Sequence, residues 1–174
     1  SSSTILKTIK SVDEQTYKHI EHIFIDGGSK DNTVKIINQN SNRIVKIISE
    51  KDRGIYDAMN KGINCSKGDI IGILNSDDKF ASNEIIYKIV NSFCKHKCDI
   101  LYGNINYVNN NDRIIRSWNS SSYKKGSFLY GWHPPHPSLF LNKSVYNFSG
   151  LFDLNFKIAA DFEFMLRIFT NNLY

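Results

Sequence analysis

Two adjacent acidic residues, Asp77 and Asp78, follow an apolar segment (69–74) that is typical of a buried strand. This pair has two interpretations. The acids can form a solvated turn before a helix, where negative charge is favourable. They can also bind a divalent cation, because Mg²⁺ and Mn²⁺ prefer carboxylate oxygens, and such an ion could bridge the phosphates of a substrate. The two residues alone leave both interpretations open.

A second candidate segment is the glycine-containing turn 26–33, which begins at Asp26 after another apolar run. One interpretation is a plain connection whose Asp31 caps the next helix. The other is a site that holds a ribose or a base by hydrogen bonds. Neither the glycine fingerprint of dinucleotide-binding proteins nor a phosphate-binding P-loop occurs in the chain.

Two further segments lie in the second half of the chain. A proline-rich loop (132–140) places His133 and His136 in a stiffened segment, although a lone histidine is more often structural. Asp161 stands at the start of the last predicted helix. There it can simply favour the helix dipole, or it can take a proton from an incoming hydroxyl group.

The elements that must position these side chains follow from the spacing of apolar residues. The pattern alternates strands and helices, which predicts an α/β fold with a mostly parallel sheet and crossover helices. Because such crossovers are right-handed, Asp26 and the 75–78 turn should share one edge of the sheet, where ligands bind. A β-meander (100–118), a short strand and a C-terminal helix should follow. The predicted strands are 22–25, 43–49, 69–74, 100–103, 105–108, 113–118 and 138–141, and the predicted helices start near 4, 31, 55, 82 and 159.

Composition narrows the class of protein. The 174 residues are 41% hydrophobic and carry a net charge of +5, which indicates an ordinary folded chain, and no dense basic run indicates nucleic-acid binding. Three cysteines (65, 94 and 98) without zinc-site spacing argue for free thiols in a reducing compartment. No apolar run is long enough to cross a membrane. The chain lacks an initiator Met, and the first strand of such a fold should precede residue 1, so we expect a fragment of a longer chain.

Five segments, in their order along the chain, resemble glycosyltransferase family 2, whose members have the GT-A fold. The resemblance covers nearly the whole chain. It implies a single domain (1–174), with a nucleotide-binding half (1–98) and a half for the acceptor and the catalytic base (99–174). The segments are "FIDGGSKDNTVKII", "SEKDRGIYDAMNKGI", "GDIIGILNSDDKF", "GWHPPHPSLF" and "LFDLNFKIAADFEFMLRI".

The resemblance also implies an activity: transfer of a sugar, with inversion, from a nucleotide-diphosphate donor such as a UDP-sugar to an acceptor hydroxyl. The sequences of the last two segments are similar to those of transferases that build bacterial surface polysaccharides, whose acceptors are often lipid-linked saccharides. This similarity implies a cytoplasmic protein that meets the inner face of the plasma membrane, which its positive charge would favour. The alternative is a non-catalytic nucleotide-sugar-binding module or an inactive fragment.

The same resemblance assigns roles to individual residues. Asp78 would hold Mg²⁺ or Mn²⁺ on the donor diphosphate, with Asp77 towards the nucleotide sugar, and Asp161 would be the general base. Gly27 stands where many relatives carry a second acid that contacts the base. The remaining candidates for substrate binding are Asp26, Arg53, Asp57, Asn60 and His136, of which Asp57 and Asn60 could instead be structural.

Overall fold

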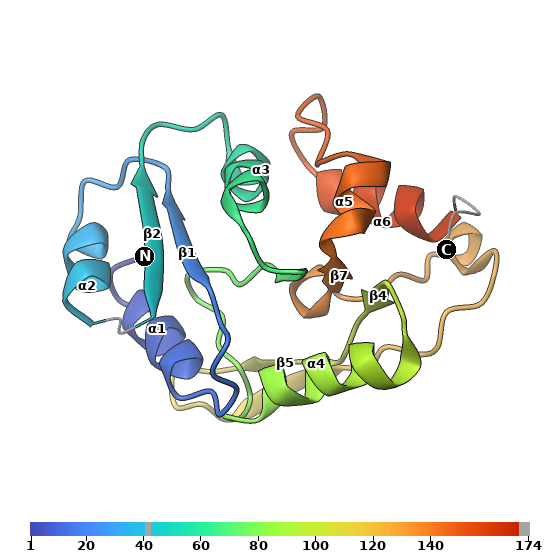
Figure 1. Ribbon diagram of the computed structural model, residues 1–174, viewed down its shortest axis with the longest axis horizontal. Helices are drawn as coiled ribbons and strands as arrows, with labels where there is room; N and C mark the ends of the chain where they lie inside the picture. Colours follow the sequence, from blue (N-terminus) through green and yellow to red (C-terminus); the bar gives the residue numbers. More distant parts are fainter. Residues whose placement is uncertain (41–42, 171–174) are drawn as a thin grey trace.

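The computed structural model of the chain describes residues 1–40 and 43–170, in which helices alternate with short strands (Figure 1). The helices are α1 (Ile5–Asp13), α2 (Thr33–Asn40), α3 (Ile55–Cys65), α4 (Ile85–His96), α5 (Lys143–Ser149) and α6 (Ala160–Thr170), with 3₁₀ turns η1 (Ser127–Tyr130) and η2 (His136–Ser138). The strands are β1 (His22–Asp26), β2 (Ile44–Ser49), β3 (Ile70–Gly72), β4 (Ile100–Leu101), β5 (Ile105–Val108), β6 (Ile114–Trp118) and β7 (Phe140–Asn142). Every predicted element is present, whereas α5 was not predicted. The end of the expected half 99–174 lies outside the described residues.

The N-terminal part is built on two parallel strands. β1 and β2 pair with Asp26 opposite Ser49 at their carboxyl ends. Helix α1 places Ile5 and Ile9 on one face, as their spacing of four residues requires, and both are buried with Phe24 of β1 and Ile37 of α2. This small core fixes the end of β1, where Asp26 begins its turn.

A second ladder has β7 at its centre. β7 runs antiparallel to β3 on one side and to β4 on the other, so Leu141 faces both Ile71 and Ile100 across the ladder and is fully buried. β3 and β4 therefore run in the same direction on the two sides of β7. The α/β class predicted from the alternation of elements is confirmed.

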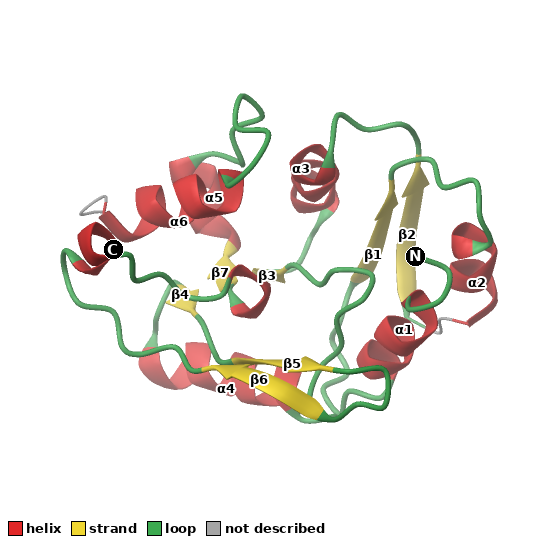
Figure 2. Ribbon diagram, turned by 180° about the vertical axis from the view of Figure 1, so that it is seen from behind, coloured by secondary structure: helices red, strands yellow, loops and turns green. Residues whose placement is uncertain are grey.

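The expected β-meander is only partly correct. β5 and β6 form the antiparallel hairpin, but β4 joins β7 instead of β5 (Figure 2). The reason is burial: Ile100 packs against the core cluster, whereas most residues of the β5–β6 hairpin are exposed. Two-residue β4 thus gains more apolar contact beside β7 than it would beside the hairpin.

A groove of about 1340 Å³ lies between the β1–β2 pair and the ladder formed by β3, β7 and β4. Ile23 and Ile25 of β1 line one wall, Ile71 and Ile73 line the other, and the apolar face of α4 contributes Phe93. Helix α3 packs against β1, while Ile63 on the same helix is buried in the C-terminal core. α3 therefore contacts both parts of the molecule (Figure 1).

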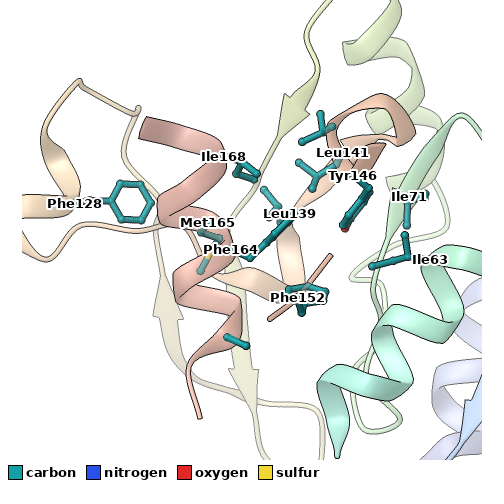
Figure 3. Close-up of a cluster of buried hydrophobic side chains, with 12 residues drawn as sticks. Ile63, Ile71, Phe128, Leu139, Leu141, Tyr146, Phe152, Phe164, Met165 and Ile168 are labelled. Atoms are coloured by element: carbon teal, nitrogen blue, oxygen red, sulfur yellow. The ribbon is translucent and has the colours of Figure 1, made fainter. Parts of the chain in front are cut away.

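The main core lies around β7 and α6. Phe164, Met165 and Ile168 of α6 are buried against Leu139 and Leu141, as the close-up in Figure 3 shows. This cluster also includes Ile63 and Ile71 from the expected nucleotide-binding half, so side-chain packing crosses the expected boundary at residue 98. Among the described residues, no helix is both long and apolar enough to cross a membrane.

One glycine of the second ladder has a packing role that can be tested. A Cβ atom on Gly72 would overlap the ring of Phe140, which lies opposite it on β7. Gly72→Ala should therefore lower the free energy of unfolding by about 1–3 kcal/mol, the usual effect of overpacking, in urea denaturation. Gly103→Ala is the matched control, because nothing lies within 4 Å of a Cβ there. Equal midpoints for both variants would contradict this packing.

Candidate active site

Asp26 is buried at the end of β1, where its carboxylate organises the turn that follows. Oδ2 accepts hydrogen bonds from the backbone N–H groups of Gly28 (3.2 Å) and Ser29 (2.9 Å) and from the Ser49 hydroxyl (2.6 Å). Burial alone would raise the pKa of Asp26, but the hydrogen bonds from Ser29, Ser49 and Gly28 outweigh it and hold that pKa below its ordinary value. These three hydrogen bonds all reach Oδ2, so a ligand would be held through Oδ1.

The acidic turn after β3 is held from both sides. Asn75 donates to Asp78 Oδ2 (2.8 Å), and Thr8 of α1 donates to the backbone oxygens of Ser76 (3.0 Å) and Asp78 (2.8 Å). Asp77 is exposed, whereas Asp78 is half-buried. Burial, with the neighbouring charge of Asp77, raises the pKa of Asp78, although the bond from Asn75 acts in the opposite direction.

The two turns come together, as the sequence predicted. Asp26, Gly27 and Ser29 line a cavity of about 240 Å³, together with Leu74 and Ser76 from the acidic turn. A small polar cavity therefore lies between the turn that follows β1 and the turn that carries Asp77 and Asp78. This is one place where the chain can hold a polar ligand.

The segment before α3 also approaches the Asp26 turn. A Cβ atom on Gly27 would lie 2.5 Å from Asp52 Oδ2, so the Asp52 carboxylate fills the space beside this glycine. Asp52 in turn accepts the backbone N–H of Gly54 (2.9 Å). An acid is thus present beside Gly27 although the sequence has none at that position, and sequence reasoning missed it because it comes from another segment.

Arg53 and Asp57 form a clasp at the start of α3. Asp57 accepts the backbone N–H of Arg53 (3.0 Å) and its guanidinium (3.2 Å), and these contacts lower the pKa of Asp57. The Arg53 side chain is 76% exposed and could reach a ligand, whereas Asp57 is nearly buried. Asp57 therefore forms ion pairs with Arg53 and with Lys61, whose ammonium nitrogen lies 3.7 Å from Asp57 Oδ2.

Asn60 has the contacts of a structural residue. Its side-chain amide donates to the carbonyl of Phe152 (2.9 Å) and its oxygen accepts the N–H of Phe152 (3.0 Å). Both polar ends of this buried side chain are used in joining α3 to the segment before α6. Of the two roles left open by the sequence, the geometry favours the structural one.

Asp161 lies in the first turn of α6 and meets a residue from α3. Tyr56 donates a hydrogen bond from its hydroxyl to Asp161 Oδ1 (2.9 Å). Burial lowers the pKa of His136, although the negative charge of Asp161 is close enough to act in the opposite direction. Asp161, Tyr56 and His136 therefore form a second polar cluster, and sequence reasoning missed Tyr56 in it.

His136 is fixed by its surroundings. It lies in η2, after two buried prolines, and its ring packs edge-on against Phe152 at 5.5 Å between centroids. His133 packs instead against Trp118 and Phe162. The proline-rich loop thus points His136, but not His133, into the cluster around Asp161.

The acidic turn also has the donor set of a magnesium or manganese site. The described residues contain no group of three His, Cys, Asp or Glu side chains that could enclose a metal ion. Mg²⁺ is usually held by one or two carboxylates while phosphate oxygens and waters complete its shell, and Asp78 with Asp77 fits this pattern. A cation would also relieve the half-buried charge of Asp78.

Comparison with known proteins settles the family. The model of Glycosyl transferase family 2 matches residues 1–149. The chain belongs to glycosyltransferase family 2. An uncharacterised glycosyltransferase of Mycobacterium tuberculosis is 38% identical over 167 residues, which cover 92% of this chain and 62% of that protein. The chain therefore spans about three fifths of the length of this family 2 relative.

Two other comparisons extend the family assignment. The Escherichia coli enzyme WfgD, a UDP-Glc:alpha-D-GlcNAc-diphosphoundecaprenol beta-1,3-glucosyltransferase, is 33% identical over 112 residues, covering 64% of this chain and 44% of WfgD. Residues 1–349 of the S. aureus protein TarS, solved in complex with UDP, superimpose with a TM-score of 0.78 at 17% identity, over 96% of this chain and 51% of that TarS chain. The fold of this family 2 chain is accordingly the GT-A fold.

Proposed function

We propose that the protein transfers a sugar from a nucleotide-diphosphate donor to an acceptor hydroxyl with inversion at the anomeric carbon. The observation that carries this proposal is the pair of polar sites in a family 2 domain. One is the cavity between the Asp26 turn and the acidic turn, and the other is the cluster around Asp161. A donor-binding site and a separate base are the two parts that such a reaction needs.

The donor would lie against the first site. Asp26 Oδ1 would accept a hydroxyl of the nucleoside, Asp77 would lie towards the nucleotide sugar, and exposed Arg53 would meet the phosphates. Asp78 would hold Mg²⁺ or Mn²⁺ on the diphosphate. Such an ion, when bound, neutralises the charge that develops on the leaving phosphate.

Asp161 would take the proton of the acceptor. As the acceptor oxygen forms its bond to the anomeric carbon, the bond from that carbon to the diphosphate breaks, and the nucleotide diphosphate leaves with the electron pair. The acceptor proton goes to Asp161 Oδ2, since Oδ1 is held by Tyr56. His136, neutral because of its burial, could donate a hydrogen bond to the sugar or the diphosphate.

The comparisons support a narrower version of this proposal. TarS binds UDP and WfgD acts on a lipid-linked sugar, so we infer a UDP-sugar donor and a lipid-linked saccharide acceptor used in bacterial surface polysaccharide synthesis. A lipid-linked acceptor would bring the protein to the inner face of the plasma membrane, as a peripheral cytoplasmic protein. The net charge of +5 would favour an anionic lipid surface.

The alternative is a module that binds nucleotide sugars without turning them over. The groove beside β1 is the observation that favours it. A screen of UDP- and GDP-sugars with Mn²⁺ tests both, using calorimetry for binding and nucleotide release for turnover. We expect binding and release with one donor, and an inverted anomeric centre in the product by NMR. Binding without release would favour the module, and retention of configuration would contradict the mechanism.

A further inference from the structure

We propose that Tyr56 is a positioning residue for Asp161: it holds one carboxylate oxygen so that the other faces the acceptor as the base. This inference rests on the proposed function, because it gives Asp161 the role of base. It concerns a residue that lies on α3, 105 positions away in sequence, and that has no acid–base role of its own.

The hydrogen bond has a fixed direction. The Tyr56 hydroxyl donates to Asp161 Oδ1 at 2.9 Å. Burial, and then the hydrogen bond to that carboxylate, raise the pKa of Tyr56 above its ordinary value, so the hydroxyl stays protonated at physiological pH. Tyr56 is therefore a permanent donor, and a donor to a carboxylate favours its ionised form.

The contact distinguishes the two oxygens of Asp161. Oδ1 is used by Tyr56, and among the described residues no donor reaches Oδ2. A base needs a free lone pair that points at the proton it accepts, so Oδ2 is the oxygen that can act. Without Tyr56, rotation of the carboxylate would exchange the two oxygens and spread the lone pairs over several directions.

The backbone around Tyr56 and Asp161 is held in place as well. Tyr56 and Asn60 lie one helical turn apart on the same face of α3, and Asn60 fixes the backbone of Phe152 through two hydrogen bonds. Ala159, just before α6, has φ +63°, a left-handed conformation that is unfavourable for a residue with a Cβ. A strained backbone conformation persists where the surrounding contacts hold it. Tyr56 supplies one such contact, because it hydrogen-bonds to Asp161 in the first turn of α6, directly after Ala159.

Other titratable groups near Asp161 do not replace this donor. His136 of η2 faces it, but burial keeps that imidazole largely neutral. Glu163 on α6 itself is paired with Arg167, which donates to both of its oxygens at 2.8 Å. In the described part of the chain, Tyr56 is thus the group that hydrogen-bonds to the Asp161 carboxylate.

Tyr56→Phe tests the inference, since it removes only the hydroxyl. The readout that needs no substrate is the carboxyl-¹³C NMR signal of Asp161 at one fixed pH, assigned by its loss in Asp161→Asn. In Tyr56→Phe that signal should change its chemical shift, because the carboxylate loses the donor that holds Oδ1. With the donor found in the screen, kcat should fall by about 10-fold and the donor KM should not change.

Tyr123→Phe is the matched control, because its hydroxyl donates to the Phe169 carbonyl (2.9 Å) farther along α6. It should leave the Asp161 signal and kcat as they are in the unchanged protein. An Asp161 signal that is the same in Tyr56→Phe as in Tyr123→Phe would overturn the inference. If the signal moves but Asp161→Asn keeps full activity, the contact stands and the proposed function is what fails.

Discussion

Asp161→Asn is expected to lower the rate of sugar transfer by about 10²–10⁴-fold, the usual contribution of a positioned general base. The substitution keeps the size of the side chain, and an amide oxygen can still accept the bond from Tyr56. The amide nitrogen would then stand in place of Oδ2, and it has no lone pair for a proton. UDP affinity by calorimetry should not change, because the proposed nucleotide contacts come from the turns at Asp26 and Asp78.

Asp153→Asn is a suitable control for this variant. It makes the same chemical change in the segment before α6, where the Asp153 side chain accepts the backbone N–H of Asn155 (2.9 Å). We expect its rate of transfer to match that of the unchanged protein. A rate for Asp161→Asn that equals the control rate would show that Asp161 is not the base, whatever the donor.

The sequence predicted the elements well because most of them repeat apolar residues with a clear period. Helix α1 is an example: Ile5, Ile9 and Val12 define one face and all three are buried. Pairing between strands was harder to predict, since two apolar residues such as Ile100 and Leu101 fit beside many partners. Helix α5 was missed because it is short and buries only Val145 and Tyr146, too few residues to establish a period.

Within the site, sequence reasoning named Asp26, the acidic turn and Asp161 as candidates, but not the groups that hydrogen-bond to them. Asp26 and the acidic turn were expected on one edge, and they do line one cavity. Tyr56 was missed because an aromatic residue in a helix is most simply a core residue, and its hydroxyl partner lies 105 positions away. Asn60 was ambiguous for the same reason, since Phe152 comes from a distant segment. Spacing along one element carries no information on such long-range partners.

Asp78→Asn should lower the activity of the protein but raise the stability of its metal-free form. Activity with Mn²⁺ should fall by at least about 100-fold, since a cation on the diphosphate contributes several kcal/mol to the transition state. The affinity that Mn²⁺ adds to UDP binding should disappear in calorimetry. Stability of the metal-free protein should instead rise at neutral pH, because Asp78 has a raised pKa when folded. Its stabilising effect is present at low pH and is lost as pH rises through that pKa.

The sign of the stability change separates a metal site from an ordinary structural turn. Asp99→Asn is the matched control, because Asp99 also accepts a side-chain amide, from Asn142 at 2.7 Å, as Asp78 does from Asn75 at 2.8 Å. The control should keep both activity and Mn²⁺-dependent binding of UDP. If Asp78 served only the turn, its loss would destabilise the protein and leave the Mn²⁺ dependence intact. In a binding site, a half-buried charge can destabilise the free protein and still be required for ligand binding. The reason is that the opposing charge arrives only with the metal and the donor.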